Sequence, residues 1–149
     1  HTALEIIADL PNLTHFVAAV GTGGTITGVG KILKEHNKAI HVTAVEPKGS
    51  AVLSGEEPGK HKIQGIGAGF IPEILDTSVY DNIIKIEDED AFETARLLAR
   101  KLGLFVGIST GANVYAAYQL SKLLPAGKTI LTVSPSNGER YLSTELYND

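Results

Sequence analysis

The strongest chemical signal in this chain is the segment Gly21-Thr22-Gly23-Gly24-Thr25. It follows the apolar run 15–20 and precedes a helical pattern that opens at Ile26, so it predicts a strand, a loop and a helix start. Glycines let the backbone approach a ligand, threonine hydroxyls donate hydrogen bonds, and a helix N-terminus carries unpaired N–H groups and about half a positive charge. Together these properties favour an anion.

The pattern of this loop narrows the kind of anion. The phosphate-loop motif G-x-x-x-x-G-K-[ST] requires a lysine, and none follows here. The dinucleotide motif G-x-G-x-x-G requires a third glycine where this chain has Ile26. Nucleoside triphosphates and dinucleotides are therefore disfavoured, and a small phosphate monoester is the expected ligand.

A second segment, 107–111, matches the G-x-S-x-G motif of serine hydrolases. On that fold the catalytic histidine follows the serine, but all five histidines of this chain precede Ser109. We therefore expect Ser109 or Thr110 to cap the following helix, and Gly111 to permit close packing. The histidine spacings match no metal motif, so no metal site is expected. His61, between two lysines, is expected to be exposed.

Two more segments combine glycine with a few polar residues. Segment 62–72 has glycine at every second position from Gly65 to Gly69, which predicts a backbone wall that approaches a ligand closely. An ordinary flexible loop also fits this pattern. Segment 132–144 leaves a strand at its carboxyl end, the edge where open α/β sheets bind ligands, although a turn that caps a terminal helix also fits.

Strand and helix patterns alternate along the chain. We expect strands at 14–20, 41–45, 83–86, 104–108 and 129–133, helices at 3–10, 26–36, 88–102 and 112–124, and a long excursion at 47–69. This order predicts an α/β fold in three layers, with a mostly parallel sheet covered by helices on both faces. The acidic run 87–90 is explained by the dipole of the helix it opens rather than by a metal.

Composition excludes several classes of protein. The chain has 149 residues and 43% hydrophobic content, enough for the core of one domain, and its net charge of -4 with interspersed signs disfavours a nucleic-acid groove. No apolar run approaches membrane-spanning length. The absence of cysteine excludes disulfides and thiolate metal sites and fits the cytoplasm. Because His1 stands inside an expected helix, we expect the chain to be a piece of a longer protein.

Four segments together resemble one known family. Segments 21–25, 62–72, 107–112 and 135–144 occur in this order in cysteine synthase, also called O-acetylserine sulfhydrylase, a fold-type II pyridoxal-phosphate enzyme. The resemblance covers nearly the whole chain. Cystathionine β-synthase shares the first pattern, but strings 64–70 and 138–144 are more similar to cysteine synthase. A phosphoserine-dependent sulfhydrylase and a non-catalytic paralogue that binds an acetyltransferase also remain compatible with the resemblance.

The resemblance implies a role for individual residues. Those implied to hold the phosphate of pyridoxal phosphate are Gly21, Thr22, Gly23, Gly24 and Thr25, with Ser136 facing the pyridine nitrogen. Those implied to line the active site beside the substrate are Gln64, Gly65, Ile66 and Gly67, with Ala68 and Phe70 at its mouth. A neutral serine does not stabilise a protonated ring nitrogen, which suits replacement at the β-carbon better than transamination.

The implied reaction is loss of acetate from O-acetylserine followed by addition of sulfide to give L-cysteine. The resemblance also implies a homodimer, and a mouth that receives the C-terminal tail of serine acetyltransferase. The family's Schiff-base lysine lies upstream of the phosphate loop, and none of the twenty residues before Gly21 is lysine. We therefore expect residues 1–149 to be the C-terminal part of the enzyme, most of its large cofactor-holding domain, with no catalytic residue and no activity alone.

Overall fold

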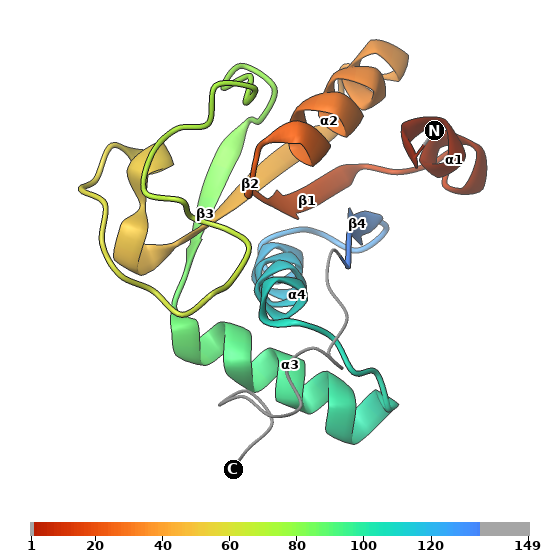
Figure 1. Ribbon diagram of the computed structural model, residues 1–149. Coiled ribbons are helices and arrows are strands. Elements are labelled where there is room, and N and C mark those ends of the chain that lie inside the picture. Colours follow the sequence, from red (N-terminus) through yellow and green to blue (C-terminus); the bar gives the residue numbers. More distant parts are fainter. Residues whose placement is uncertain (1, 135–149) are drawn as a thin grey trace.

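The computed structural model describes residues 2–134, and its centre is a parallel sheet of four strands. The strands are β1 (His15–Ala19), β2 (His41–Pro47), β3 (Asn82–Ile86) and β4 (Ile130–Thr132). Their order across the sheet is β3-β2-β1-β4 (Figure 1). The register places His15 of β1 beside His41 on one side and Ile130 on the other.

Helices cover both faces of this sheet. The pair α1 (Thr2–Asp9) and α2 (Gly24–His36) lies on one face, and the pair α3 (Asp88–Leu102) and α4 (Ile108–Ser121) lies on the other (Figure 1). Between β2 and β3 the chain leaves the sheet through two short 3₁₀ helices, η1 (Lys48–Ser50) and η2 (Val52–Ser54). The predicted long excursion is confirmed.

Alternate side chains of the central strand enter two separate cores. In β1, Phe16 and Ala18 pack with α1 and α2, whereas Val17 packs with α3 and α4. Successive side chains of a strand point to opposite faces, so a strand buried on both faces reads as a continuous apolar run. The predicted three-layer α/β architecture is confirmed, and it explains why the run before Gly21 has no polar alternation.

The strand order reverses at β1. From β1 the chain proceeds to β2 and then β3 in one direction, but β4 returns to the opposite side of β1. In open α/β sheets, the crevice beyond the carboxyl ends of the strands at such a reversal is where ligands bind. A ligand site is therefore expected at the carboxyl ends of β1 and β4.

Two predictions between α3 and α4 are wrong. Residues 104–108 form no strand: Leu104 and Phe105 are 51% and 52% exposed, and α4 already begins at Ile108, which leaves Val106 in an isolated bridge. Ser109 and Thr110 do not cap α4, since they lie inside its first turn and its N-cap is Gly107. Their side chains are instead buried against the protein.

The ends of α3 agree with the sequence signals. Its first turn carries three acidic residues and its last turn two basic ones, which complements the helix dipole. Gly103 ends the helix with φ 66°, and its N–H donates to the carbonyls of Ala99 and Leu98.

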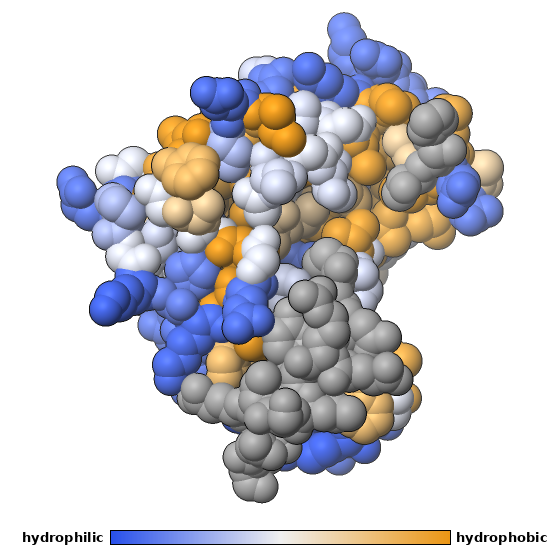
Figure 2. Space-filling model, in the orientation of Figure 1, coloured by the Kyte–Doolittle hydropathy of each residue, from blue (hydrophilic) through white to orange (hydrophobic). Residues whose placement is uncertain are grey.

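No helix within residues 2–134 has the length and apolar character needed to cross a membrane. In the view of Figure 2, apolar patches are separate and interspersed with hydrophilic ones.

Candidate functional site

The glycine-rich loop lies at the carboxyl end of β1, where the fold places a ligand crevice. Gly23 is the N-cap of α2 and has φ 92°, a conformation that favours glycine. A Cβ at Gly23 would also lie 2.7 Å from Cβ of Leu75. The N-cap of α2 makes no side-chain hydrogen bond; the N–H of Gly24 donates to the hydroxyl of Thr22, and the N–H groups after it in the first turn can face an anion.

Open space adjoins this helix start. A cavity of about 450 Å³ is lined by Thr22, Gly24, Thr25 and Gly28, together with residues of α1 and the next turn of α2. This volume falls within the range of small-molecule sites. The backbone of Gly24 donates to Oγ1 of Thr22 at 3.3 Å, which fixes the threonine hydroxyl beside the helix start. The geometry therefore supplies both donors and room for a phosphate group.

Residues 64–70, the part of segment 62–72 that forms the predicted wall, pack directly against this loop. The N–H of Gly67 donates to the carbonyl of Val20 at 3.2 Å, and a Cβ on Gly21 would lie 2.5 Å from the carbonyl oxygen of Gly65. A narrow cavity is lined by Gly21, Gly67, Ala68 and Phe70 among others. The structure thus brings together two segments that are more than forty residues apart in the sequence.

The members of this wall differ in their orientation. Gln64, Gly65, Ala68 and Phe70 are exposed, and Phe70 is 63% exposed. Ile66 is buried in the core formed with α3 and α4, so its side chain anchors the wall. The roles that the resemblance implies for these residues toward substrate stay a prediction.

His61 supports this wall through a hydrogen bond to the backbone of Gly67. The expectation that His61 is exposed is wrong. Its ring is partly buried: Nδ1 accepts from the N–H of Ile63 at 3.1 Å, and Nε2 lies 2.8 Å from the carbonyl oxygen of Gly67. Because Nδ1 accepts and a carbonyl only accepts, Nε2 carries the proton. Gly67 has φ 62°, and a Cβ there would lie 2.5 Å from Cγ of Pro47 and 2.8 Å from Nε2 of His61, so no larger residue fits.

A buried carboxylate supports the same region. Glu46 at the end of β2 is 2% exposed and accepts hydrogen bonds from the N–H of Leu53 at 2.8 Å and from the N–H and hydroxyl of Ser54 at 3.0 and 2.6 Å. It also lines the narrow cavity beside Gly21. Burial, and then the charge of Glu46, raise the pKa of Tyr80. The sequence analysis did not single out Glu46, although a single acidic residue at the end of an apolar strand was a visible signal.

A buried amide on α4 connects the two strands beside the crevice. Asn113 is fully buried; its Oδ1 accepts from the N–H of Ala19 at 2.8 Å, and its Nδ2 donates to the carbonyl of Val133 at 2.9 Å. Oγ1 of Thr110 lies 3.1 Å from Oγ of Ser134. Sequence reasoning missed Asn113, although an asparagine inside a helix of small and apolar residues was a visible signal.

Gly111, two residues earlier on α4, does permit close packing as predicted. A Cβ at this position would collide with the carbonyl of Ala91 and lie 3.1 Å from Cβ of Ala95, both on α3. The absence of a side chain thus lets α3 and α4 approach each other closely.

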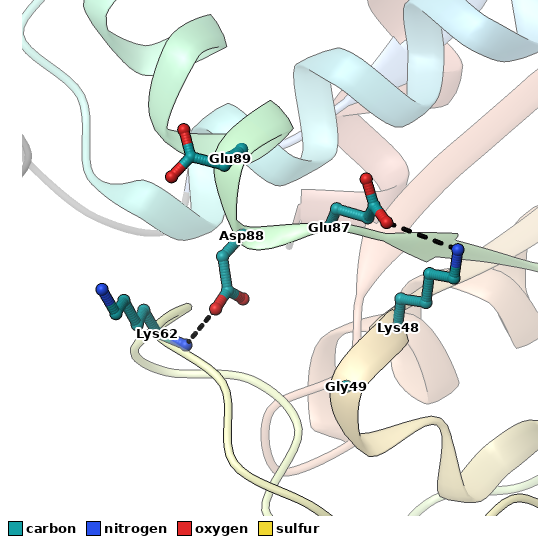
Figure 3. Close-up of a pocket in the computed structure, with 6 residues that line it drawn as sticks. All are labelled: Lys48, Gly49, Lys62, Glu87, Asp88 and Glu89. Atoms are coloured by element: carbon teal, nitrogen blue, oxygen red, sulfur yellow. Dashed lines mark hydrogen bonds and ion pairs between the residues drawn. The ribbon is translucent and has the colours of Figure 1, made fainter.

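A separate cavity of about 480 Å³ lies at the start of α3 (Figure 3). There Lys48 pairs with Glu87 at 3.3 Å, the backbone N–H of Lys62 donates to Oδ2 of Asp88 at 3.0 Å, and the carboxylate of Glu89 turns away from Lys48. These acidic residues are thus engaged by a lysine, a loop and the helix dipole. In the part of the chain from 2 to 134, no three His, Cys, Asp or Glu side chains are grouped to hold a metal ion.

One predicted site residue, Ser136, lies outside the described residues, as does the whole segment 135–144. The described part of β4 and its extension, up to Ser134, approaches the same edge of the sheet as the glycine-rich loop. The site as described therefore consists of the loop, the wall formed by residues 64–70 and the supports behind them.

Comparison with known proteins agrees with this geometry. A family model described as "Pyridoxal-phosphate dependent enzyme" matches residues 1–136. Cysteine synthase of Staphylococcus aureus is 57% identical over 133 residues, which is 89% of this chain and 43% of the relative. The solved cysteine synthase of Entamoeba histolytica superposes with a TM-score of 0.95 at 47% identity, covering 99% of this chain and 45% of that one.

An O-acetylserine dependent cystathionine beta-synthase from Helicobacter pylori superposes with a TM-score of 0.90 at 46% identity, covering 99% of this chain and 48% of that one. The chain therefore spans less than half the length of each of these proteins. A family match over residues 1–136, together with a shared fold and the phosphate-loop geometry, leads to one conclusion. This chain belongs to the family of pyridoxal-phosphate dependent enzymes.

Proposed function

We propose that this chain is the cofactor-holding part of a cysteine synthase, which makes L-cysteine from O-acetylserine and sulfide. The observation that carries the proposal is the uncapped, glycine-rich start of α2, which lies against the wall formed by residues 64–70 at the carboxyl edge of the sheet. The likeness to cysteine synthases supports the choice of reaction. Residues 1–149 would then form most of the large domain of a longer, dimeric, cytoplasmic enzyme.

The described residues fit pyridoxal phosphate. The start of α2 has no side-chain cap, the cavity beside Thr22 and Thr25 holds about 450 Å³, and Gly23 has a backbone conformation that favours glycine. A phosphate group there would accept hydrogen bonds from N–H groups at the start of α2 and from the two threonine hydroxyls. When bound, the cofactor supplies the electron sink for bond breaking at the α- and β-carbons of an amino acid.

The wall residues would then orient the substrate and limit access of water. Backbone groups at Gly65 and Gly67 face the loop side, and Gln64 is exposed, where its amide can reach a polar substrate group. Phe70, which the resemblance implies at the mouth, is 63% exposed, and Ile71 and Ile74, which follow it in the chain, are 51% and 62% exposed. An exposed apolar mouth of this kind suits an apolar C-terminal residue of a partner peptide, which supports serine acetyltransferase as the proposed partner.

The test is a product assay on the protein expressed from its complete gene. We expect bound pyridoxal phosphate, detected by its visible absorbance, and cysteine formation from O-acetylserine and sulfide. The 149-residue chain alone should form no cysteine, because none of its first twenty residues is a lysine that could carry the cofactor. A complete protein that binds the cofactor but makes no cysteine from these substrates would refute the proposed reaction.

A second candidate is cystathionine formation, favoured by the likeness to the Helicobacter pylori enzyme at 46% identity. The two reactions differ in the nucleophile that adds at the β-carbon. Supplying sulfide and homocysteine together at equal concentration, with O-acetylserine or O-phosphoserine as the amino-acid donor, separates them by product. Predominant cystathionine would favour the second candidate over cysteine synthase. Binding of a peptide ending in isoleucine without any turnover would favour a non-catalytic paralogue.

A further inference from the structure

The backbone hydrogen bonds between β1 and β4 follow a regular spacing, which predicts the next pair of groups that would bond. The N–H of His15 donates to the carbonyl of Thr129 at 3.0 Å, and the register pairs Val17 with Thr132. In a parallel ladder, every second N–H of a strand points to the same neighbour. Continued at this spacing, the ladder would pair the N–H of Ala19 with the carbonyl of Val133.

The side chain of Asn113 occupies that rung. Its Oδ1 accepts from the N–H of Ala19 at 2.8 Å, and its Nδ2 donates to the carbonyl of Val133 at 2.9 Å. A direct rung would hold the two backbone atoms about 2.9 Å apart, whereas an amide inserted between them allows a separation of up to about 8 Å. The carboxyl ends of β1 and β4 are thus held apart by a group of fixed length.

This spacing is built into the core. Asn113 is fully buried, and no buried polar side-chain atom among the described residues lacks a hydrogen-bond partner. One residue before Val133, the hydroxyl of Thr132 donates to the carbonyl of Val17 at 2.7 Å, so the strands separate only after this tether. A carboxamide carries one acceptor and one donor group on a rigid plane, which matches the N–H and C=O that it joins.

The separation coincides with the reversal of strand order, where the ligand crevice is expected. The phosphate loop starts at Gly21, two residues after Ala19, so the spacing of the two strands also fixes where this loop lies relative to the carboxyl end of β4. We propose that Asn113 is a positioning residue that sets the distance between the phosphate loop and the carboxyl end of β4, the space into which pyridoxal phosphate would extend from its phosphate group. This inference rests on the proposed function, which supplies the cofactor.

The first experiment compares Asn113→Ala with wild type in the protein expressed from its complete gene. Apoprotein is titrated with pyridoxal phosphate and, separately, with inorganic phosphate. We expect Asn113→Ala to raise the Kd of pyridoxal phosphate tenfold or more and to leave the Kd of phosphate within twofold, because the loop alone is unchanged. Thr43→Val is the control: Thr43 is equally buried but donates to Asn82 between β2 and β3, away from the crevice.

Asn113→Asp supplies a second test that does not depend on the alanine variant folding. An ionised aspartate turns an acceptor toward the carbonyl of Val133, whereas a protonated one restores the donor. The Kd of pyridoxal phosphate relative to wild type should therefore improve as pH falls, with no such trend in Thr43→Val.

Three results would overturn the inference while leaving the proposed function intact: an unchanged cofactor Kd in Asn113→Ala, an equal loss of phosphate binding, or no recovery of Asn113→Asp at low pH. A wild-type protein that binds no pyridoxal phosphate would instead refute the proposed function, and the inference with it.

Discussion

Replacing Gly21 with alanine tests how closely the loop and the wall formed by residues 64–70 depend on each other. Gly21 is not among the glycines with positive φ, so its backbone accepts alanine without strain. The added Cβ would lie 2.5 Å from the carbonyl oxygen of Gly65. An unstrained contact of this kind needs about 1 Å more, and a backbone carbonyl cannot rotate away as a flexible side chain can.

The displacement sets the size of the effect. Moving one loop N–H by about 1 Å stretches its bond to a phosphate oxygen from about 2.9 Å beyond hydrogen-bonding distance. A hydrogen bond to a charged group contributes about 1.5–3 kcal/mol, so the Kd of pyridoxal phosphate should rise roughly 10- to 100-fold. The overpacking itself should lower the free energy of unfolding by about 1–3 kcal/mol.

Cofactor titration of the apoprotein and urea unfolding without cofactor measure these two quantities separately. The matched control is Gly28→Ala in α2, where a Cβ meets nothing within 4 Å. Because Gly28 lines the cavity beside the loop, this control serves for stability only, and it should gain up to about 1 kcal/mol from helix propensity. Thr43→Val, between β2 and β3, serves for the cofactor Kd, which it should keep within about twofold. Gly21→Ala with wild-type cofactor affinity would refute the contact between loop and wall as a determinant of binding.

Three further predictions concern the supports of the site. Gly111→Ala should lower the free energy of unfolding by about 1–3 kcal/mol relative to Gly28→Ala, measured by urea unfolding, because its Cβ collides with the carbonyl of Ala91. Burial alone would raise the pKa of Asp81, but bonds from Lys34 and the N–H of Val42 hold this pKa below its usual value, so protonation by acid weakens these contacts. Stability should therefore fall as pH drops below about 4, less so in Asp81→Asn, when urea midpoints at pH 6 and pH 3 are compared. Glu46→Gln should cost about 1–3 kcal/mol in urea unfolding, since its amide nitrogen faces a backbone donor; an unchanged midpoint would contradict this.

The elements that the sequence predicted well are those where several local signals agree. For α3, the acidic first turn, the apolar face, the basic last turn and Gly103 all indicate the same boundaries, and the structure has a helix at 88–102. Segment 104–108 offered apolar residues alone, without turn signals on both sides. A short apolar run does not distinguish a strand from a connection and helix start, and the tertiary packing of α4 decided it.

The site was predictable where it depends on backbone chemistry. The loop 21–25 has a pattern that requires glycine, and Gly23 is indeed in the left-handed region. The supports were not predictable, because they depend on distant pairs: His61 bonds the wall rather than solvent, and Asn113 joins two strands that are far apart in sequence. Local patterns carry no information about which backbone groups a buried side chain will meet.

The lining of the cavity beside the phosphate loop explains why these supports matter. The residues that line the cavity beside the phosphate loop are uncharged, so an anion there is met by N–H groups, hydroxyls and the dipole of α2 rather than by a lysine. Such donors are fixed to the backbone, and their strength depends on where the backbone lies to within a few tenths of an ångström. On the proposed function, we therefore expect cofactor binding to depend also on Glu46 and His61 behind the wall and on Asn113 between the strands, through the backbone positions that their hydrogen bonds hold. A substitution at any of these positions should change the cofactor Kd through the geometry of the site.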